Sequence, residues 1–183
     1  MSNVNSVYIH IPFCKNICTY CDFCKLLYNE EFISKYLVAL KNEINDKYMG
    51  EVIKTLYIGG GTPSSLSPKL LNNLFSIVKL IKLDSNYEFT FECNIYDINE
   101  ELLKILKDNK VNRLSIGIES FNHDNLELMD RVCTYDDTEK KLKLCRKYGF
   151  NNINLDLIYA LPYESFKTLK NDVKQLIKLN PEH

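Results

Sequence analysis

Short apolar runs alternate along this chain with longer segments of helical periodicity, and this alternation restricts its fold more than any other feature. Five runs rich in β-branched and aromatic residues predict strands, at residues 6–11, 54–60, 87–94, 113–120 and 152–161. Each is followed by a predicted helix, at residues 29–48, 69–81, 99–109, 123–130 with 136–149, and 165–179. In the first helix the predicted apolar stripe is Phe32, Tyr36, Leu40 and Ile44. Five such units predict an α/β fold of parallel strands with right-handed crossovers, either a doubly wound sheet or a barrel.

Chemically unusual stretches follow each predicted strand. In both architectures the carboxyl ends of parallel strands meet at one rim, where helix N-termini point into a shared crevice. The stretches at this rim are a cysteine cluster (residues 14–24), a glycine turn (59–64) and the strand ends 92–94, 117–120 and 155–162. Strands that served only as core would not be expected to share this feature, so the sequence predicts a functional site there.

The cysteine cluster has three possible roles: a disulfide knot, a structural zinc site or an iron–sulfur cluster. The 183 residues are 45% hydrophobic, so the chain can bury a core without disulfides, and its seven cysteines are an odd number. The N-terminus lacks a secretory pattern, and no apolar run approaches the roughly 20 residues that span a bilayer. We therefore expect a soluble cytoplasmic protein, in which clustered cysteines indicate metal or redox chemistry. A net charge of −1 gives no electrostatic footprint for nucleic acid, so a small molecule or a protein is the expected partner.

The spacing of the cysteines bears on the two metal alternatives. Cys14, Cys18 and Cys21 are spaced C-x3-C-x2-C, and three thiolates from one short loop can hold three irons of a 4Fe-4S cube while the fourth iron stays open. A zinc site would add Cys24 as the fourth thiolate of a closed tetrahedron. Zinc loops usually bring cysteine pairs from separate segments, so the crowding of all four cysteines favours the iron–sulfur cluster.

The blocks YIHIPFC, CTYCDF, LYIGGGTPS, RLSIGIESF and LDLIYALP resemble, in order and at similar intervals, those of the radical S-adenosylmethionine (SAM) superfamily. Within it the chain resembles the oxygen-independent coproporphyrinogen III oxidase group, and most nearly its HemW-like branch, over essentially its whole length. The resemblance implies a partial (β/α) barrel of six βα units, of which residues 1–183 supply about five as a radical SAM core domain. We therefore expect a chain truncated at its C-terminal end, with its fifth strand left as an unpaired edge.

The resemblance also implies which residues hold the cofactors. Cys14, Cys18 and Cys21 would ligate the cluster, and the amino and carboxylate groups of SAM would chelate its open iron. The residues expected to contact SAM are Tyr8, Tyr20, Gly59, Gly60, Gly61, Thr62, Glu92, Glu119, Arg131 and Asp156.

Individual roles follow from the same resemblance. Arg131 would pair with the carboxylate of SAM, and Glu92 would accept hydrogen bonds from its methionyl part. Glu119 and Asp156 would accept from the ribose hydroxyls, and Tyr20 would lie near the adenine. The glycine turn would let backbone groups approach the methionyl amino group closely.

Simpler roles remain open for several of these residues. The glycine run could be a plain tight turn, Asp156 could make a structural hydrogen bond, and Arg131 could be an ordinary helix-terminal cation. His10 could be a core histidine with one satisfied ring nitrogen. The remaining cysteines are most simply small core or surface residues, at Cys93, Cys133 and Cys145.

The resemblance implies reductive cleavage of SAM to methionine and a 5'-deoxyadenosyl radical, or haem binding and delivery, or both, so enzyme and chaperone both remain open. Oxidative decarboxylation of coproporphyrinogen and a zinc-stabilised scaffold are the alternatives. Phe23 stands where the oxidases proper continue their cysteine motif, which weakens the oxidase alternative. Glu119 and Glu164 replace glutamines of the family, and Cys133 replaces a histidine of the HemW-like signature. The implied partners are an electron donor such as flavodoxin or ferredoxin, haem and a haem-accepting protein.

Overall fold

The computed structural model describes residues 4–162 and 164–183. Its strands are β1 (Ser6–Ile11), β2 (Phe13–Cys14), β3 (Leu26–Leu27), β4 (Ile53–Gly60), β5 (Leu83–Asn94), β6 (Arg113–Glu119) and β7 (Ile153–Leu157). Its α-helices are α1 (Glu30–Lys47), α2 (Pro68–Val78), α3 (Glu100–Asp108), α4 (His123–Leu128), α5 (Tyr135–Lys147) and α6 (Phe166–Leu179). Two short 3-10 turns are η1 (Pro63–Ser65) and η2 (Ile95–Asp97).

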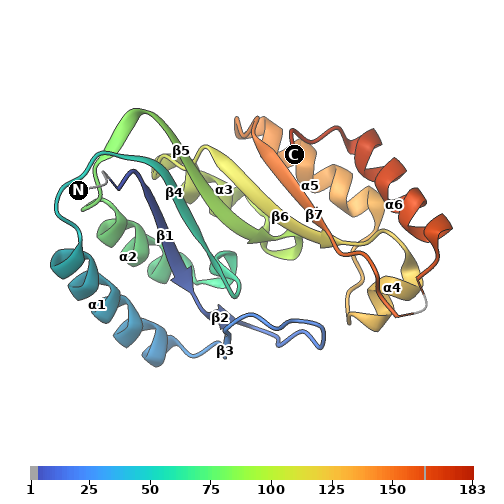
Figure 1. Cartoon of the computed structure of the whole chain (residues 1–183), viewed down its shortest axis with the longest axis horizontal. Coiled ribbons are helices and arrows are strands. Elements are labelled where there is room, and N and C mark those ends of the chain that lie inside the picture. Colours follow the sequence, from blue (N-terminus) through green and yellow to red (C-terminus); the bar gives the residue numbers. More distant parts are fainter. Residues whose placement is uncertain (1–3, 163) are drawn as a thin grey trace.

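Five strands form one parallel sheet in the order β1-β4-β5-β6-β7, which is also their order in the chain (Figure 1). Each connection contains a helix, because parallel neighbours cannot be joined by a tight turn. A doubly wound sheet would reverse its strand order at a switch point, whereas this sheet proceeds in one direction like part of a barrel. The predicted α/β fold with a partial barrel is therefore confirmed.

The five predicted strands of this sheet are present, and only two of their ends differ from the prediction by more than one residue. β5 begins at Leu83 rather than at residue 87, and β7 ends at Leu157 rather than at residue 161. Beyond Leu157 the chain bends away, since Ile158 N donates to Glu119 O (2.8 Å) and Ala160 adopts a left-handed backbone conformation (φ 64°). The strands β2 and β3 are two residues long each, too short to produce a periodic signal.

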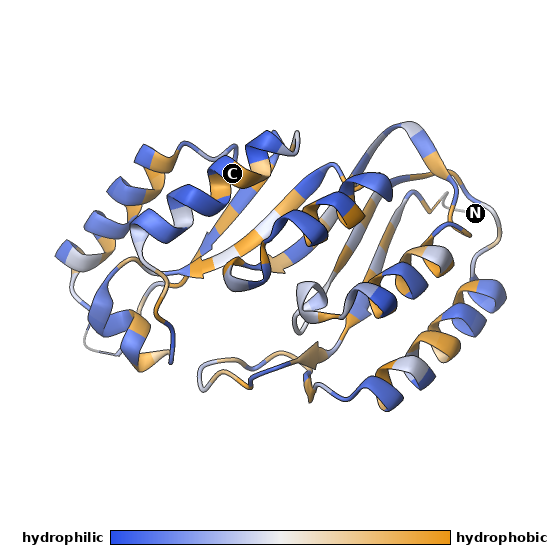
Figure 2. Cartoon of the chain, turned by 180° about the vertical axis from the view of Figure 1, so that it is seen from behind, coloured by the Kyte–Doolittle hydropathy of each residue, from blue (hydrophilic) through white to orange (hydrophobic). Residues whose placement is uncertain are grey.

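The two faces of the sheet differ in chemistry because side chains alternate along each strand. One face carries the large buried side chains of the core, among them Ile58, Phe91 and Ile116. Helices cover this face: they lie behind the sheet in Figure 1 and in front of it in Figure 2. The other face is open, in that the described helices do not cover it, and it is mostly polar. Its residues include Tyr57, Glu92, Asn154 and Asp156, together with Thr90 and Ser115, which are buried among their neighbours.

The first helix buries Leu40 and Ile44 as predicted, but Ile33 and Leu37 take the place of Phe32 and Tyr36 in its buried stripe. Asn29 caps α1 by accepting a hydrogen bond from Phe32 N (2.9 Å), and the side chain of Phe32 is 50% exposed. The residues that α1 buries are Ile33, Leu37, Leu40 and Ile44. Two apolar stripes compete in this helix, and the one that reaches the sheet excludes Phe32. None of the described helices is long and apolar enough to cross a membrane.

The outer edge of β7 is partly paired. Leu155 N donates to His183 O (3.0 Å), and the backbone N–H groups of Glu182 and His183 donate to Ile153 O (3.1 and 3.2 Å). The Glu182 side chain accepts a further hydrogen bond from Ile153 N (2.9 Å). The prediction of an unpaired fifth strand is therefore wrong along this part of the edge, because the segment after α6 returns beside it.

Candidate functional site

The cysteine loop (residues 14–24) lies at the carboxyl edge of the sheet, beside the ends of β1 and β4 (Figure 1). Its base is closed by the parallel pair β2 and β3, through hydrogen bonds from Leu26 N to Pro12 O (2.6 Å) and from Tyr28 N to Cys14 O (2.8 Å). The ring nitrogen Nε2 of His10 lies 3.0 Å from the carbonyl oxygen of Cys24, near the end of the loop. The strand that precedes the loop thus also holds its far end.

The four cysteines of the loop are not equivalent. Cys14 is buried, Cys18 and Cys21 are half-buried, and Cys24 is exposed. Burial raises the pKa of the Cys14 thiol, an effect opposed by a hydrogen bond from Thr62 Oγ1 to its sulfur (3.4 Å). Thr62, predicted to contact SAM, is here a neighbour of the first cysteine.

These residues suit an iron–sulfur cluster better than a single zinc ion. Among the described residues, no three or more His, Cys, Asp or Glu side chains are grouped so that they could hold one metal ion. A cube of irons and sulfides spreads its thiolate ligands farther apart than a single ion does, and sulfur is its preferred ligand. The start of the loop packs closely on Gly61, since a Cβ atom added there would lie only 2.8 Å from the Cys14 sulfur. Three cysteines on one loop over this side-chain-free surface fit the cluster.

The glycine turn at the end of β4 packs against Glu92 and His10. Glu92 accepts hydrogen bonds from the Tyr57 hydroxyl (2.7 Å) and from Gly60 N (2.8 Å). A Cβ atom at Gly59 would lie 2.6 Å from the Glu92 carboxyl carbon, and one at Gly60 would lie 2.7 Å from His10 Nδ1. Gly60 also has φ 127°, a conformation that side chains disfavour. These contacts account for the glycines by internal packing, and the contact with the methionyl amino group stays a prediction.

Both ring nitrogens of His10 have partners. Nδ1 lies 2.9 Å from the Tyr8 hydroxyl and Nε2 lies 3.0 Å from the Cys24 carbonyl. His10 thus has a structural role, with two satisfied ring nitrogens rather than the one expected. Tyr8 itself is exposed on the open face and lies beside Tyr57, with ring centroids 5.8 Å apart and the ring planes tilted by 34°.

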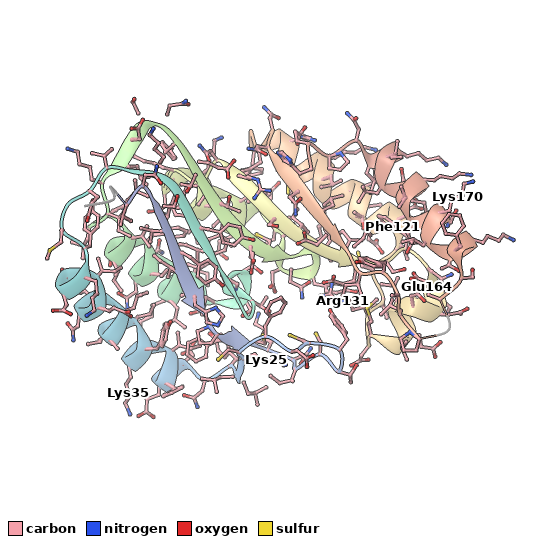
Figure 3. The ribbon with its side chains drawn as sticks, in the orientation of Figure 1. Lys25, Lys35, Phe121, Arg131, Glu164 and Lys170 are labelled. Atoms are coloured by element: carbon pink, nitrogen blue, oxygen red, sulfur yellow. The ribbon has the colours of Figure 1, made fainter. Side chains whose placement is uncertain are left out.

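Glu119, Arg131 and Tyr20 meet at the end of β6. Arg131 Nη2 lies 3.2 Å from Glu119 Oε1, and Arg131 Nη1 donates to Gly117 O (3.1 Å). The Tyr20 hydroxyl is 3.5 Å from the same Glu119 oxygen, and it reaches this point from the cysteine loop. Figure 3 shows Arg131 between the end of the sheet and that loop.

This ion pair is largely buried, with side chains 10% exposed for Arg131 and 12% for Glu119. Burial raises the pKa of Glu119 by more than the neighbouring guanidinium of Arg131 lowers it. Arg131 is therefore not an ordinary helix-terminal cation: its charge is held inside the site. The structure pairs these two residues with each other, and their contacts with different parts of SAM stay predictions.

Asp156 lies on the open face near the end of β7. Asn154 Nδ2 donates to its Oδ1 (2.6 Å), and the Ser115 hydroxyl lies 3.4 Å from its Oδ2. In the register of the sheet Asp156 is opposite Gly117, and the Glu119 carboxylate lies over that glycine, since a Cβ atom added at Gly117 would lie 2.6 Å from Glu119 Oε1. The structural hydrogen bonds are thus present, and the exposed carboxylate retains further acceptor positions.

Sequence reasoning missed several polar residues of the open face, notably Tyr57, Ser115 and Asn154, which support Glu92 and Asp156. The signal that could have found them is the alternation of polar and apolar residues within the strands. The cysteines outside the loop are all buried, as small core residues, at Cys93, Cys133 and Cys145.

A model of the radical SAM superfamily matches residues 8–176. The heme chaperone HemW of Lactococcus lactis is 41% identical over 180 residues, which are 98% of this chain and 47% of that protein. An oxygen-independent coproporphyrinogen III oxidase of Cereibacter sphaeroides is 30% identical over 184 residues, 97% of this chain and 40% of that protein. The chain thus spans about half the length of the curated relatives it matches.

Among solved structures, coproporphyrinogen III oxidase (HemN) from Escherichia coli, described as a radical SAM enzyme, superposes with a TM-score of 0.88. The match has 30% sequence identity and covers 97% of this chain and 42% of that one. A radical SAM methyltransferase from Kitasatospora setae matches at 15% identity with a TM-score of 0.65, which is a likeness of fold alone.

Proposed function

Because the chain belongs to the radical SAM superfamily and is HemW-like in sequence, we propose that it holds a 4Fe-4S cluster on Cys14, Cys18 and Cys21 and binds SAM beside it. The observation that carries this proposal is the placement of the cysteine loop on the side-chain-free glycine turn, with Glu92 and Glu119 at the same edge. Residues 1–183 would act as one radical SAM core domain.

When bound, the cluster supplies the electron for reductive cleavage of SAM to methionine and a 5'-deoxyadenosyl radical. The chain's own residues would bind the cluster and SAM and orient them relative to each other. Cys14 is already seated by burial and by Thr62, so it would fix one corner of the cluster. Cys24 is exposed and its carbonyl contacts His10, so we propose that it is not a ligand.

The residues proposed to hold SAM need little rearrangement except at one place. Asp156 and Glu92 are fixed by neighbouring side chains and keep lone pairs that can accept from a ligand. Arg131, proposed to bind the carboxylate of SAM, already forms an ion pair with Glu119. Binding therefore requires Arg131 to share its five donors between Glu119 and the cofactor, or to exchange one partner for the other.

The physiological task we propose is haem binding and delivery, as the name of the HemW relatives suggests. Phe23 at the position where coproporphyrinogen oxidases continue their cysteine motif supports this reading over oxidative decarboxylation. Haem transfer to an acceptor without consumption of SAM would support the chaperone. Formation of 5'-deoxyadenosine that depends on an added substrate would support an enzyme instead.

The cluster is tested by anaerobic reconstitution with iron and sulfide. We expect a brown protein with broad absorption near roughly 400 nm and about four irons per chain. Cys14→Ala, Cys18→Ala and Cys21→Ala should each abolish the colour. Cys24→Ala is the matched control, since it removes a neighbouring thiol of the same loop, and it should keep both colour and iron. Loss of the cluster in Cys24→Ala would contradict the ligand assignment.

A further inference from the structure

Asp172 is a buried acid in a helix that is otherwise at the surface. It is the one residue of α6 that is fully buried, with 1% of its surface exposed. Its Oδ2 accepts a hydrogen bond from the Ser120 hydroxyl (2.5 Å), and its Oδ1 has no partner among the described residues. Burial raises the pKa of this carboxyl, and the hydrogen bond from Ser120 opposes the rise. Burying a carboxyl is costly, and nothing in α6 itself requires it.

Asp172 belongs to a polar network that joins four elements. Ser120, which is fully buried, lies at the end of β6 and also accepts hydrogen bonds from Asn122 N (3.0 Å) and from Asn125 Nδ2 (3.3 Å) of α4. Asn125 Nδ2 also donates to Glu164 Oε1 (3.1 Å). Figure 3 shows Glu164 on the side of α4, away from the cysteine loop. The network therefore reaches from α6 through the end of β6 to the loop after β7.

The network holds two strained segments. Glu119, directly before Ser120, has φ 71°, and Ala160 has φ 64°, both in the left-handed region that residues other than glycine seldom adopt. Glu164 Oε2 accepts from Ala160 N (2.7 Å), and Ile158 N donates to Glu119 O (2.8 Å). Such conformations persist only where the surroundings impose them. Here the imposing groups are the buried polar side chains around Asp172.

We propose that Asp172 is a positioning residue for the cofactor site: through Ser120 it holds the turn that aims Glu119, and through Asn125 and Glu164 it holds the loop that follows Asp156. The inference rests on the proposed function, in which Glu119 and Asp156 accept hydrogen bonds from the ribose of SAM. Asp172 acts through these residues and touches no cofactor itself. Its substitution should therefore alter SAM binding while leaving the cysteine loop and its cluster intact.

Equilibrium binding of SAM to the reconstituted full chain tests the proposal. Asp172→Ala and Ser120→Ala should each weaken binding roughly tenfold, the effect of one misplaced charge-assisted hydrogen bond. Asp172→Asn should stay within about threefold of the unmodified chain, because its amide oxygen can still accept from Ser120. Iron content and the absorption spectrum should be unchanged in all three variants.

Asn112→Ala is the matched control. Asn112 lies just before β6, at the end opposite Glu119, where it accepts from Phe89 N (2.7 Å) and donates to Tyr87 O (2.9 Å). The substitution removes side-chain hydrogen bonds at the start of β6, the end far from Glu119. The free energy of unfolding should therefore fall while SAM affinity stays unchanged. Equal weakening of SAM binding in Asn112→Ala and Asp172→Ala would overturn the proposal, because it would reveal a general effect of stability.

Amide hydrogen exchange in the cofactor-free chain provides a second readout. In Asp172→Ala the amides of Ser120, Ile158 and Ala160 should lose protection, while those of the cysteine loop should not change. If the unmodified chain binds SAM, unchanged hydrogen exchange together with unchanged SAM affinity in Asp172→Ala would overturn the proposal. If Asp172→Ala does not fold, Ser120→Ala and Asp172→Asn decide the same question. Failure of the unmodified chain to bind SAM would instead contradict the proposed function, and exchange would still report on the network.

Discussion

The two faces of the five-stranded sheet are built from the same strands, but one packs in the core and the other presents polar groups. The face covered by helices is apolar: Ile58, Phe91 and Ile116 are all without exposed surface. The open face carries hydrogen-bonded polar groups, such as the Tyr57–Glu92 and Asn154–Asp156 pairs. A single residue step along a strand therefore separates a side chain that stabilises the fold from one that is available to a ligand.

Because of this division, substitutions that change the free energy of unfolding should lie mainly on one face, and substitutions that change ligand affinity mainly on the other. Burial of large apolar side chains is the dominant favourable term in folding, and it lies on the covered face. Hydrogen bonds on the open face contribute little net stability because the same groups can bond to water in the unfolded chain. Substitutions on the two faces should therefore move different observables.

The largest effect is expected on the covered face. Phe91 is fully buried and packs against Phe75, with ring centroids 5.7 Å apart. Phe91→Ala should lower the free energy of unfolding by about 3–5 kcal/mol, because it removes a large side chain and leaves a cavity. Urea denaturation of the cofactor-free chain measures this change. A loss below about 1 kcal/mol would show that the covered face is not the main source of stability.

Next in size is a pure binding effect on the open face. Asp156→Ala should weaken SAM binding by roughly 1–3 kcal/mol, the range for a lost hydrogen bond to a charged group, without removing iron. Its free energy of unfolding should change by less than about 1 kcal/mol, since the side chain is exposed. Thr55→Ala serves as control, because Thr55 is an exposed residue of the same face whose side chain contacts Ser6 and not Asp156 (2.7 Å to the Ser6 hydroxyl), so SAM affinity should not change. Unchanged SAM affinity in Asp156→Ala would remove this residue from the site.

A smaller effect is expected at the edge of β7, which belongs to neither face. Burial alone would raise the pKa of Glu182, but hydrogen bonds from Arg146 and from Ile153 N outweigh it, so the pKa lies below its usual range. Stability from this group is therefore present above the unfolded pKa and is lost as the pH falls through the lower folded pKa. The loss should be under about 1 kcal/mol because the pair is partly exposed. Unfolding measured against pH should show this component, and Glu182→Gln should lack it.

The smallest effect concerns Glu119→Gln. The amide oxygen can still accept hydrogen bonds from Arg131, Tyr20 or a ribose hydroxyl, so SAM affinity should stay within roughly twofold. Arg131 would also keep its hydrogen bond to Gly117 O. A large loss of affinity, measured by equilibrium binding, would show that the negative charge of Glu119 is essential and that the ion pair is part of the binding mechanism.

Much of the fold could be predicted because the local periodicity of apolar residues indicates strands and helices. The five sheet strands were found from apolar and β-branched runs, whereas β2 and β3 were missed because two residues carry no period. The first half of the buried stripe of α1 was misassigned because two apolar stripes lie side by side there, and only the sheet selects between them. Local patterns predict an element better than they predict which of its sides is covered.

The candidate site was predicted as a set of residues but not as a set of contacts. Glu92, Glu119 and Asp156 could be placed at the rim because each lies near the carboxyl end of a strand, and the strands are predictable from the sequence. The pairing of Arg131 with Glu119 depends on how the segment after α4 returns to the sheet, and no local pattern encodes that path. Asp172 was missed for a related reason, since an acid in a polar helix normally faces water.

The short pair of strands at the base of the cysteine loop has a consequence for conformational entropy. Joining two distant points of a flexible chain is unfavourable, by an amount that grows slowly with loop length. The hydrogen bonds of Leu26 N to Pro12 O and of Tyr28 N to Cys14 O join these points through the backbone of the protein itself. A ligand of the loop then has only the interior of the loop to order, so more of its contact energy remains as affinity.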